Sequence, residues 1–382
     1  MLQKAHANKL PTMQTRTFTF IVTESCQLRC KYCYLVGKND SKKMPLEVAR
    51  QAVDYIFSND MLQSCDDAVF DFIGGEPLLE IELIDRTVTY IIEKMQSLSH
   101  KWLASYEIRI TTNGILYSDK RVQKFIKKYF DHLSINISID GNKQKNDKNR
   151  IFQNGRGSYD LIVDNVRLWM EQFPNEGTKM TISHEDVPYV FESLKHLVSL
   201  GIKKIDVNPV VENVWKDGDE LIYQEQLIAF ADYIIDNNLW NDLSISAFHE
   251  FNGHGYSKEQ KLSPCGSMML SIDADGYFYT CIRFARYSLR SKPPLQIGSI
   301  YQGLDSNRLR ASELFYNDIV SPQECLDCDV ASGCKWCPAE SYDSSFIGST
   351  YLRTTYSCKM HKAKVRAKNY YWNKLKMQIE ND

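Results

Sequence analysis

Apolar residues repeat with two alternating periods along the first 240 residues of the chain. Short runs rich in β-branched and aromatic residues predict strands, and each run is followed by apolar residues at helical spacing. The strands are predicted at residues 16–23, 68–73, 106–112, 132–140, 179–183 and 203–210. The helices are predicted at residues 45–59, 81–97, 121–128, 159–173, 187–200 and 221–237. Six strand–helix units with right-handed crossovers predict an α/β fold whose parallel sheet closes most of the way into a barrel.

This repeat ends near residue 241. Beyond it, residues 271–280 predict a β-hairpin that turns at Asp275 and Gly276. The last stretch, residues 359–382, is rich in lysine and predicts a solvated basic helix. We therefore expect four parts, which are a loosely ordered segment 1–15, a barrel 16–240, a second region 241–358 and a C-terminal helix 359–382.

Composition adds one unusual feature. With 43% hydrophobic residues, 25% charged residues and a formal net charge of −2, the chain has no basic footprint for nucleic acid. Its N-terminus lacks the apolar core of a signal peptide, and no apolar run is long enough to span a membrane. We therefore expect a cytoplasmic protein that binds neither nucleic acid nor membrane. The 11 cysteines, however, are clustered, which without an export signal favours metal ligation over disulfides.

Three of these cysteines lie just after the first predicted strand. Cys26, Cys30 and Cys33 would occupy the loop at its carboxyl end, which carries the chemistry in β/α barrels. Thiolates are the usual protein ligands of iron–sulfur clusters, and three of them leave one corner of a four-iron cluster open to a second molecule. Zinc is the alternative, but it normally takes four ligands, and no fourth Cys or His follows Cys33 closely.

The next three strands each end in a turn-forming motif. These motifs are residues 74–77 (Gly-Gly-Glu-Pro), 111–114 (Thr-Thr-Asn-Gly) and 138–141 (Ser-Ile-Asp-Gly). Each alone is ordinary turn chemistry, but three in succession behind the cysteine loop favour a shared binding site. Glycines permit close backbone approach, and Glu76 can accept hydrogen bonds from an ammonium group. After the fifth strand, residues 184–186 (His-Glu-Asp) either face a substrate or, through the aspartate, cap the next helix.

The spacing Cys-x3-Cys-x2-Cys, with Tyr32 just before the last cysteine, resembles that of the radical S-adenosylmethionine enzymes. This resemblance implies a partial (β/α)6 barrel over residues 16–240, in which the three cysteines hold a four-iron cluster. The open iron would chelate the amino and carboxylate groups of S-adenosylmethionine, which the reduced cluster would cleave to a 5′-deoxyadenosyl radical. The residues that match the family's cofactor motifs are Tyr32, Gly74, Gly75, Glu76, Pro77, Thr112, Asn113, Ser138, Asp140 and Arg150.

The same resemblance assigns roles to these motifs. Residues 74–77 would receive the methionine amino group, and residues 112–113 would contact the ribose. Ser138 would help to hold the methionine carboxylate, and Arg150 would steady it. The alternative for Arg150 is an ordinary surface position.

Seven later cysteines resemble the SPASM domain, an extension that binds two auxiliary four-iron clusters. The chain would then carry three four-iron clusters in all, and a zinc ribbon is the alternative for the extension. The gap before Cys337 is two residues where the family has three. Three ligands on the first auxiliary cluster would leave an open iron for a substrate thiolate, water, a backbone group or another residue. The resemblance assigns Cys265, Cys281 and Cys337 to the first auxiliary cluster and Cys325, Cys328, Cys334 and Cys358 to the second.

The combined resemblance implies a radical S-adenosylmethionine enzyme, and we predict a peptide maturase. It would install intramolecular thioether cross-links in a precursor peptide that carries repeated Cys-x-x-x units. Carbon–carbon cross-linking is an alternative. Sulfatase maturation is another, which is disfavoured because Ile282 and not aspartate follows Cys281 and no cysteine lies between Cys265 and Cys281. A non-catalytic iron–sulfur electron carrier is disfavoured because it would need no cofactor pocket.

The expected partners are a small, cysteine-containing precursor peptide and an electron donor such as flavodoxin or ferredoxin. Because the first strand begins near residue 16, we expect no winged-helix-like leader-binding domain before it. A separate protein, the barrel edge or the basic C-terminal helix would then bind the leader. Cys65, outside both cysteine motifs, is predicted to be a buried and inert thiol.

Overall fold

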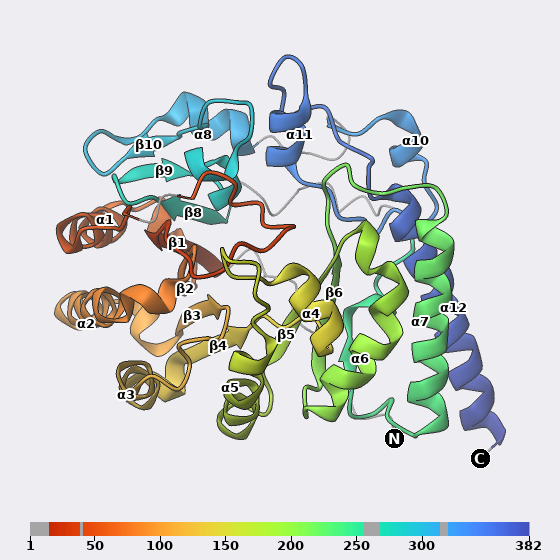
Figure 1. Ribbon diagram of the computed structural model, residues 1–382. Helices are drawn as coiled ribbons and strands as arrows, with labels where there is room; N and C mark the ends of the chain where they lie inside the picture. The colour runs from red at the N-terminus through yellow and green to blue at the C-terminus, as the bar shows by residue number, and fades with distance from the viewer. Residues whose placement is uncertain (1–14, 39–40, 256–267, 314–319, 382) are drawn as a thin grey trace.

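The computed structural model describes residues 15–38, 41–255, 268–313 and 320–381, and in it parallel strands lie inside an arc of helices (Figure 1). This arrangement confirms the predicted α/β fold, with all six predicted strand–helix pairs in place. The strands are β1 Thr15–Thr23, β2 Asp67–Gly74, β3 Tyr106–Thr112, β4 Leu133–Ile137, β5 Gly177–Ile182 and β6 Lys204–Pro209. The helices are α1 Leu46–Ser58, α2 Ile81–Ser97, α3 Lys120–Tyr129, α5 Tyr159–Gln172, α6 Val190–Ser199 and α7 Asp219–Asp236.

The parallel sheet is interrupted between β4 and β5, where a continuous barrel sheet was expected. One sheet runs from β1 to β4, and a separate sheet contains β5, β6 and the short strand β7 (Ser244–Ile245). The buried hydroxyl of Thr178 bridges the gap, because it donates to the Ile137 carbonyl (2.7 Å) and accepts from the Ile139 amide (3.2 Å). Between β4 and β5, hydrogen bonds of a side chain thus replace the backbone hydrogen bonds of a continuous sheet.

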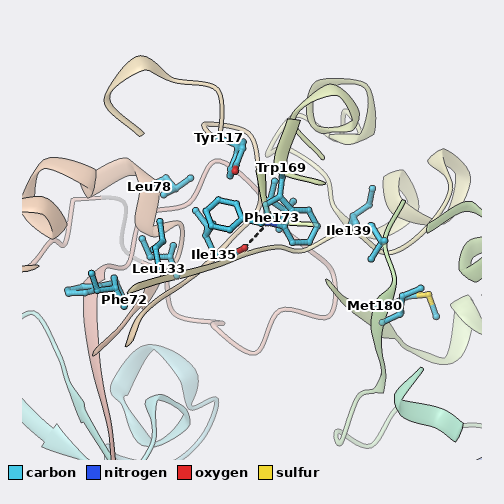
Figure 2. Close-up of a cluster of buried hydrophobic side chains, with 14 of the residues drawn as sticks. Phe72, Leu78, Tyr117, Leu133, Ile135, Ile139, Trp169, Phe173 and Met180 are labelled. Carbon is cyan, nitrogen blue, oxygen red and sulfur yellow. Dashed lines mark hydrogen bonds between the residues drawn. The ribbon is translucent and has the colours of Figure 1, made fainter. Parts of the chain in front are cut away.

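Aromatic side chains fill the space between the strands and the helices. Phe18 stacks on Phe70 and Phe20 stacks on Phe72, with ring centroids 5.7 and 5.4 Å apart. These ring pairs connect the neighbouring strands β1 and β2. Figure 2 shows Trp169 of α5 beside β4, where its indole N–H donates to the Ile135 carbonyl (2.7 Å). The polar atom of a fully buried ring therefore has a partner.

The predicted hairpin is present, but it belongs to the barrel sheet. Strands β8 (Met269–Ile272) and β9 (Tyr277–Tyr279) pair antiparallel, and Gly276 takes the left-handed conformation (φ 82°) that the turn requires. β8 also pairs in parallel with β1, and β10 (Gly298–Ser299) and β11 (Gly303–Leu304) continue the sheet beyond β9. One sheet therefore crosses the boundary predicted near residue 240.

The remaining elements are short. In the C-terminal region, the helices are α8 Ser306–Glu313, α10 Gln323–Leu326 and α11 Pro338–Ser344. Short 3-10 helices span Leu62–Ser64, Pro77–Glu80, Lys101–Ala104, Phe130–His132, His184–Tyr189, Ser246–Phe248, Ile282–Phe284 and Arg286–Ser288. None of the helices in these described ranges is long and apolar enough to cross a membrane.

Helix α12 (Cys358–Asn381) differs from the predicted solvated helix. It packs along α7 (Figure 1) and buries one face, which carries Ala363, Ala367, Tyr371 and Leu375 at a spacing of four residues. Two of its lysines are also buried, with Lys364 donating to the Gly333 carbonyl (3.2 Å) and Lys368 to the Asn252 carbonyl (2.9 Å). Only the opposite face is solvated.

Two local expectations differ from the structure near the site. Helix α4 (Lys143–Asn149) was not predicted, because its sequence Lys-Gln-Lys-Asn-Asp-Lys-Asn has no apolar period. Asn142 begins it by accepting from the Lys145 amide (3.0 Å). The suggested cap at Asp186 is wrong in position, since Ser183 is the N-cap and Asp186 is the acidic partner of a capping box.

Candidate active site

The cysteine loop follows β1 and is held by a second segment of chain. The amide of Arg29 donates to the Ile151 carbonyl (2.7 Å), and the amide of Lys31 donates to the Asn149 carbonyl (3.1 Å). These bonds attach the loop to the end of α4. Cys26 is buried, and Cys30 and Cys33 are half-buried.

The three thiols of this loop are close enough to influence one another's ionisation. Burial raises the pKa of Cys30 to about 12, Arg150 opposes the shift, and Cys33 and Cys26 add to it. Ionising all three thiols would therefore need compensating positive charge, which the irons of a cluster supply. No three His, Cys, Asp or Glu side chains within the described ranges come together closely enough to hold a single ion. Three thiols on one loop are the donor set that a four-iron cluster with one open corner would take.

The two glycines after β2 let the chain approach the cysteine loop. The amide of Gly75 donates to the Thr23 carbonyl (2.9 Å), and that of Glu76 donates to the Ser25 carbonyl (2.8 Å). A Cβ atom on Gly74 would lie 2.1 Å from the Thr23 oxygen, and one on Gly75 would lie 2.2 Å from the Ser25 oxygen. Close backbone approach was predicted for residues 74–77, and in the structure the approach is to the cysteine loop.

We expect the substitution Gly75→Ala to displace the cysteine loop, because the new methyl group overlaps a backbone oxygen that has little freedom to move. Overpacking of this kind costs about 1–3 kcal/mol. The free energy of unfolding, measured in urea, and the amount of iron bound after anaerobic reconstitution would both fall. Gly255→Ala is the matched control, since its nearest atom, the Cys328 oxygen, is 3.8 Å from the added Cβ. Equal stability and iron content in the two variants would contradict the prediction.

The carboxylate of Glu76 joins the ends of β2 and β3. It is buried and accepts from the Thr112 hydroxyl (2.6 Å), the Asn113 amide (2.7 Å) and the Leu78 amide (3.0 Å). Burial raises its pKa to about 6, and these hydrogen bonds oppose the shift. The side-chain amide of Asn113 in turn donates to the Gln27 side chain (3.1 Å) and lies 3.9 Å from the Cys26 sulfur. Two of the predicted cofactor motifs are thereby connected to the cysteine loop.

Asp140 and Arg150 form a buried ion pair at the end of β4. Arg150 Nε lies 3.0 Å from Asp140 Oδ2, and its Nη2 donates to Oδ1 (3.2 Å). Burial opposes ionisation of Asp140, but Arg150 and Lys145 outweigh it and hold the pKa of that carboxyl below its usual value. The surface alternative for Arg150 is therefore wrong. The carboxylate also accepts from the Tyr32 hydroxyl, and the guanidinium lies over the Tyr32 ring (5.7 Å), so the pair positions the cysteine loop.

The other predicted residues lie around this pair. Ser138 is half-buried, and its amide donates to the Thr112 carbonyl (2.9 Å). Pro77 is buried in the 3-10 turn after β2. Lys145, which sequence reasoning missed, is fully buried and donates to the Thr181 carbonyl (2.7 Å). It lies on the unpredicted helix α4, and nothing in its local sequence marks it as buried.

A cavity of about 400 Å³ adjoins the cysteine loop. Its walls come from residues within 31–36 of that loop, 183–185 after β5, 210–214 after β6, and 283–290 and 339–343 of the C-terminal region. Tyr32, Cys33 and His184 are among the lining residues. The cavity therefore lies between the barrel's carboxyl end and the C-terminal region, which is where ligand sites occur in β/α barrels.

The C-terminal cysteines gather in two places. Near the cavity, Arg283 donates to the Cys337 sulfur (3.7 Å) and to Glu212 (2.7 Å) and lies over the Tyr34 ring (4.4 Å). Farther along, burial raises the pKa of Cys334, Arg353 lowers it and Cys358 adds to the increase. Cys325 also interacts with Cys334 and Cys358, so these three lie together. Cys265 lies outside the described residues, and Cys65 is buried, as predicted.

Comparisons with known proteins give one family and several relatives. Residues 20–207 match the Radical SAM superfamily. An uncharacterised protein of Methanocaldococcus jannaschii is 32% identical over 185 residues, which cover 48% of this chain and 59% of that protein. The serine-type anaerobic sulfatase-maturating enzyme of Bacteroides thetaiotaomicron is 22% identical over 374 residues, which cover 87% of this chain and 84% of the enzyme.

One solved structure has a similar fold over nearly the whole chain. It is native anSMEcpe with bound AdoMet and Kp18Cys peptide, with a TM-score of 0.69 and 18% identity. The superposition covers 96% of this chain and 100% of that one. The C-terminal region therefore shares this fold together with the barrel.

Proposed function

Because residues 20–207 of this chain match the Radical SAM superfamily, we propose that the protein is a maturase that installs intramolecular thioether cross-links in a small, cysteine-containing precursor peptide. The observation that carries this proposal is the cavity of about 400 Å³ between the cysteine loop and the C-terminal cysteines. Its lining includes Cys33 on one side and Arg283, which contacts Cys337, on the other. A peptide bound there would lie between both sets of cysteines.

Cys26, Cys30 and Cys33 would hold the cluster that binds S-adenosylmethionine. When both are bound, the cluster and S-adenosylmethionine would supply the chemistry that removes one hydrogen atom from a substrate carbon. Asp140 and Arg150 position Tyr32, and with it the loop that carries Cys30 and Cys33. Each thioether link removes one hydrogen atom from carbon and one proton from sulfur, and the surplus electron needs an iron–sulfur acceptor. Clusters that the C-terminal cysteines would hold could take this acceptor role.

The cavity walls suit a peptide more than a small charged metabolite. Ion pairs line it, with Arg283 bound to Glu212 (2.7 Å) and Arg290 bound to Asp343 (2.9 Å) and Glu340 (2.5 Å). Paired charges offer hydrogen bonds without a large net charge, which suits the neutral N–H and C=O groups of a backbone. A flavodoxin or ferredoxin would deliver the electrons, and a separate protein, the barrel edge or the C-terminal helix would bind the leader.

Sulfatase maturation is the second candidate function. The similarity to the Bacteroides thetaiotaomicron enzyme over 84% of that protein favours it. Against it, Ile282 follows Cys281, so the first side chain after this cysteine cannot act as a base. In that case the substrate would be a sulfatase and not a precursor peptide.

The test is a mass spectrum of a short cysteine-containing candidate precursor peptide, after anaerobic co-expression with the enzyme. The thioether proposal expects the loss of a pair of hydrogen atoms per link, together with the loss of alkylatable thiols. The same mass loss with every thiol still alkylated would indicate carbon–carbon linkage. An unchanged precursor combined with modification of a sulfatase-derived peptide would overturn the proposal in favour of sulfatase maturation.

A further inference from the structure

A histidine on the cavity wall has an arrangement that the cofactor motifs do not explain. His184 follows β5 as the first residue of the 3-10 helix His184–Tyr189, and it lines the cavity. The capping box holds its backbone, because the Ser183 amide donates to Asp186 (2.8 Å) while Asp186 also accepts from the Asn149 side chain (2.6 Å). These hydrogen bonds therefore fix the backbone from which the imidazole extends.

The imidazole is also held from its other side by Asp219. Nδ1 of His184 lies 2.9 Å from both carboxylate oxygens of Asp219, the first residue of α7. Asp219 is buried and accepts in addition from the Lys216 amide (2.7 Å). A carboxylate can only accept, so Nδ1 carries a proton, and in the neutral imidazole Nε2 is then the nitrogen with the lone pair. Within the described residues, Nε2 makes no hydrogen bond, and the side chain is 29% exposed.

Unlike His184, the acidic side chains of the same cavity are paired with basic side chains. Glu212 is bound by Arg283, and Glu340 and Asp343 are bound by Arg290. Glu185 lies 3.5 Å from Lys148. Each of these carboxylates already has a cationic partner, whereas Nε2 of His184 has no hydrogen-bond partner among the described residues. Among the groups on this wall, His184 is the one arranged as a base.

We propose that His184 takes the thiol proton of the precursor's cysteine, and that Asp219 is the positioning residue that selects the proton-accepting tautomer. This inference rests on the proposed thioether function. In the balanced step, the C–H bond is broken by hydrogen-atom transfer to the adenosyl radical and the S–H proton passes to Nε2. The C–S bond forms between the resulting carbon radical and the thiolate, and the surplus electron leaves to an iron–sulfur acceptor. Asp219 stabilises the imidazolium, as a carboxylate does in other acid–histidine pairs.

The test compares the His184→Gln variant with the wild type. Thioether formation and deuterium transfer to 5′-deoxyadenosine are measured with a precursor peptide whose carbon-bound hydrogens are replaced by deuterium. Loss of a general base reduces a proton-transfer step about 10²–10⁴-fold, so thioether formation should fall by that factor. Hydrogen-atom transfer precedes this step, and deuterium should still appear in 5′-deoxyadenosine. His196→Gln is the matched control, because His196 bonds to the Tyr159 hydroxyl (2.6 Å) and is not among the cavity-lining residues. Added imidazole should restore part of the linkage in His184→Ala.

Two results would overturn the inference while leaving the proposed function intact. One is unchanged thioether formation by His184→Gln, and the other is loss of deuterium transfer together with the link, which would indicate a role in binding. If the wild type itself forms no link, the proposed function fails instead. A second measurement needs no turnover: ¹⁵N spectra of histidine-labelled protein should show His184 protonated at Nδ1, and Asp219→Asn should lose that tautomer. Protonation at Nε2 in the wild type would also overturn the inference.

Discussion

Replacing Cys30 by alanine is expected to abolish cleavage of S-adenosylmethionine. Two thiolates would remain for three cluster corners, and no other Cys or His of the loop is available as a substitute. Enzymes accelerate their reactions by about 10⁶-fold or more, so losing the cluster should lower 5′-deoxyadenosine release by a factor of this order. Iron per chain and 5′-deoxyadenosine, both measured after anaerobic reconstitution, check this expectation.

Cys65→Ala is the matched control for this variant. Like Cys30, Cys65 is a free thiol, but it is more deeply buried, with 4% of the residue exposed, and it lies outside the cysteine loop. Normal iron content and cleavage are expected, with some loss of stability from the small cavity left behind. Cleavage by Cys30→Ala at the wild-type rate would refute the assignment of the loop as the cluster site.

Replacing Asp140 by alanine is expected to cause the largest loss of stability. It would leave the guanidinium of Arg150, 7% exposed, without its carboxylate partner. Removing one partner of a buried pair costs about 3–5 kcal/mol, because an uncompensated charge stays in the interior. Urea unfolding of the cluster-free protein measures this cost apart from any loss of metal. The loop should also loosen, since Tyr32 loses the acceptor of its hydroxyl.

Two further variants separate burial from charge in this measurement. Asp217→Ala removes the partner of Lys359 at the surface, where the side chain of Asp217 is 97% exposed, and no measurable change is expected. The double variant Asp140→Ala/Arg150→Met removes both buried charges and should recover part of the lost stability. If Asp140→Ala were as stable as Asp217→Ala, the ion pair would have no structural role.

The sequence alone predicted the strand–helix alternation well, because each element's apolar period reports which of its faces is buried. Helix α2 is found at Ile81–Ser97, the range predicted from its period, and the hairpin turns at Gly276 as its turn chemistry indicated. Cysteine spacing likewise identified the loop at the end of β1. These features are local, so a few neighbouring residues are enough to specify them.

Tertiary structure alone decided which elements meet. Periodicity does not say which partner covers a buried face, so the pairing of β8 with β1 and the burial of Lys145 and Arg150 were invisible in the sequence. The same holds for the contact of Gly75 with Ser25, and for that of His184 with Asp219, 35 positions away. The sequence by itself determined the repeat and the cysteine loop. The fold determined how distant polar groups combine into a site, because that depends on contacts between segments that do not influence each other's local conformation.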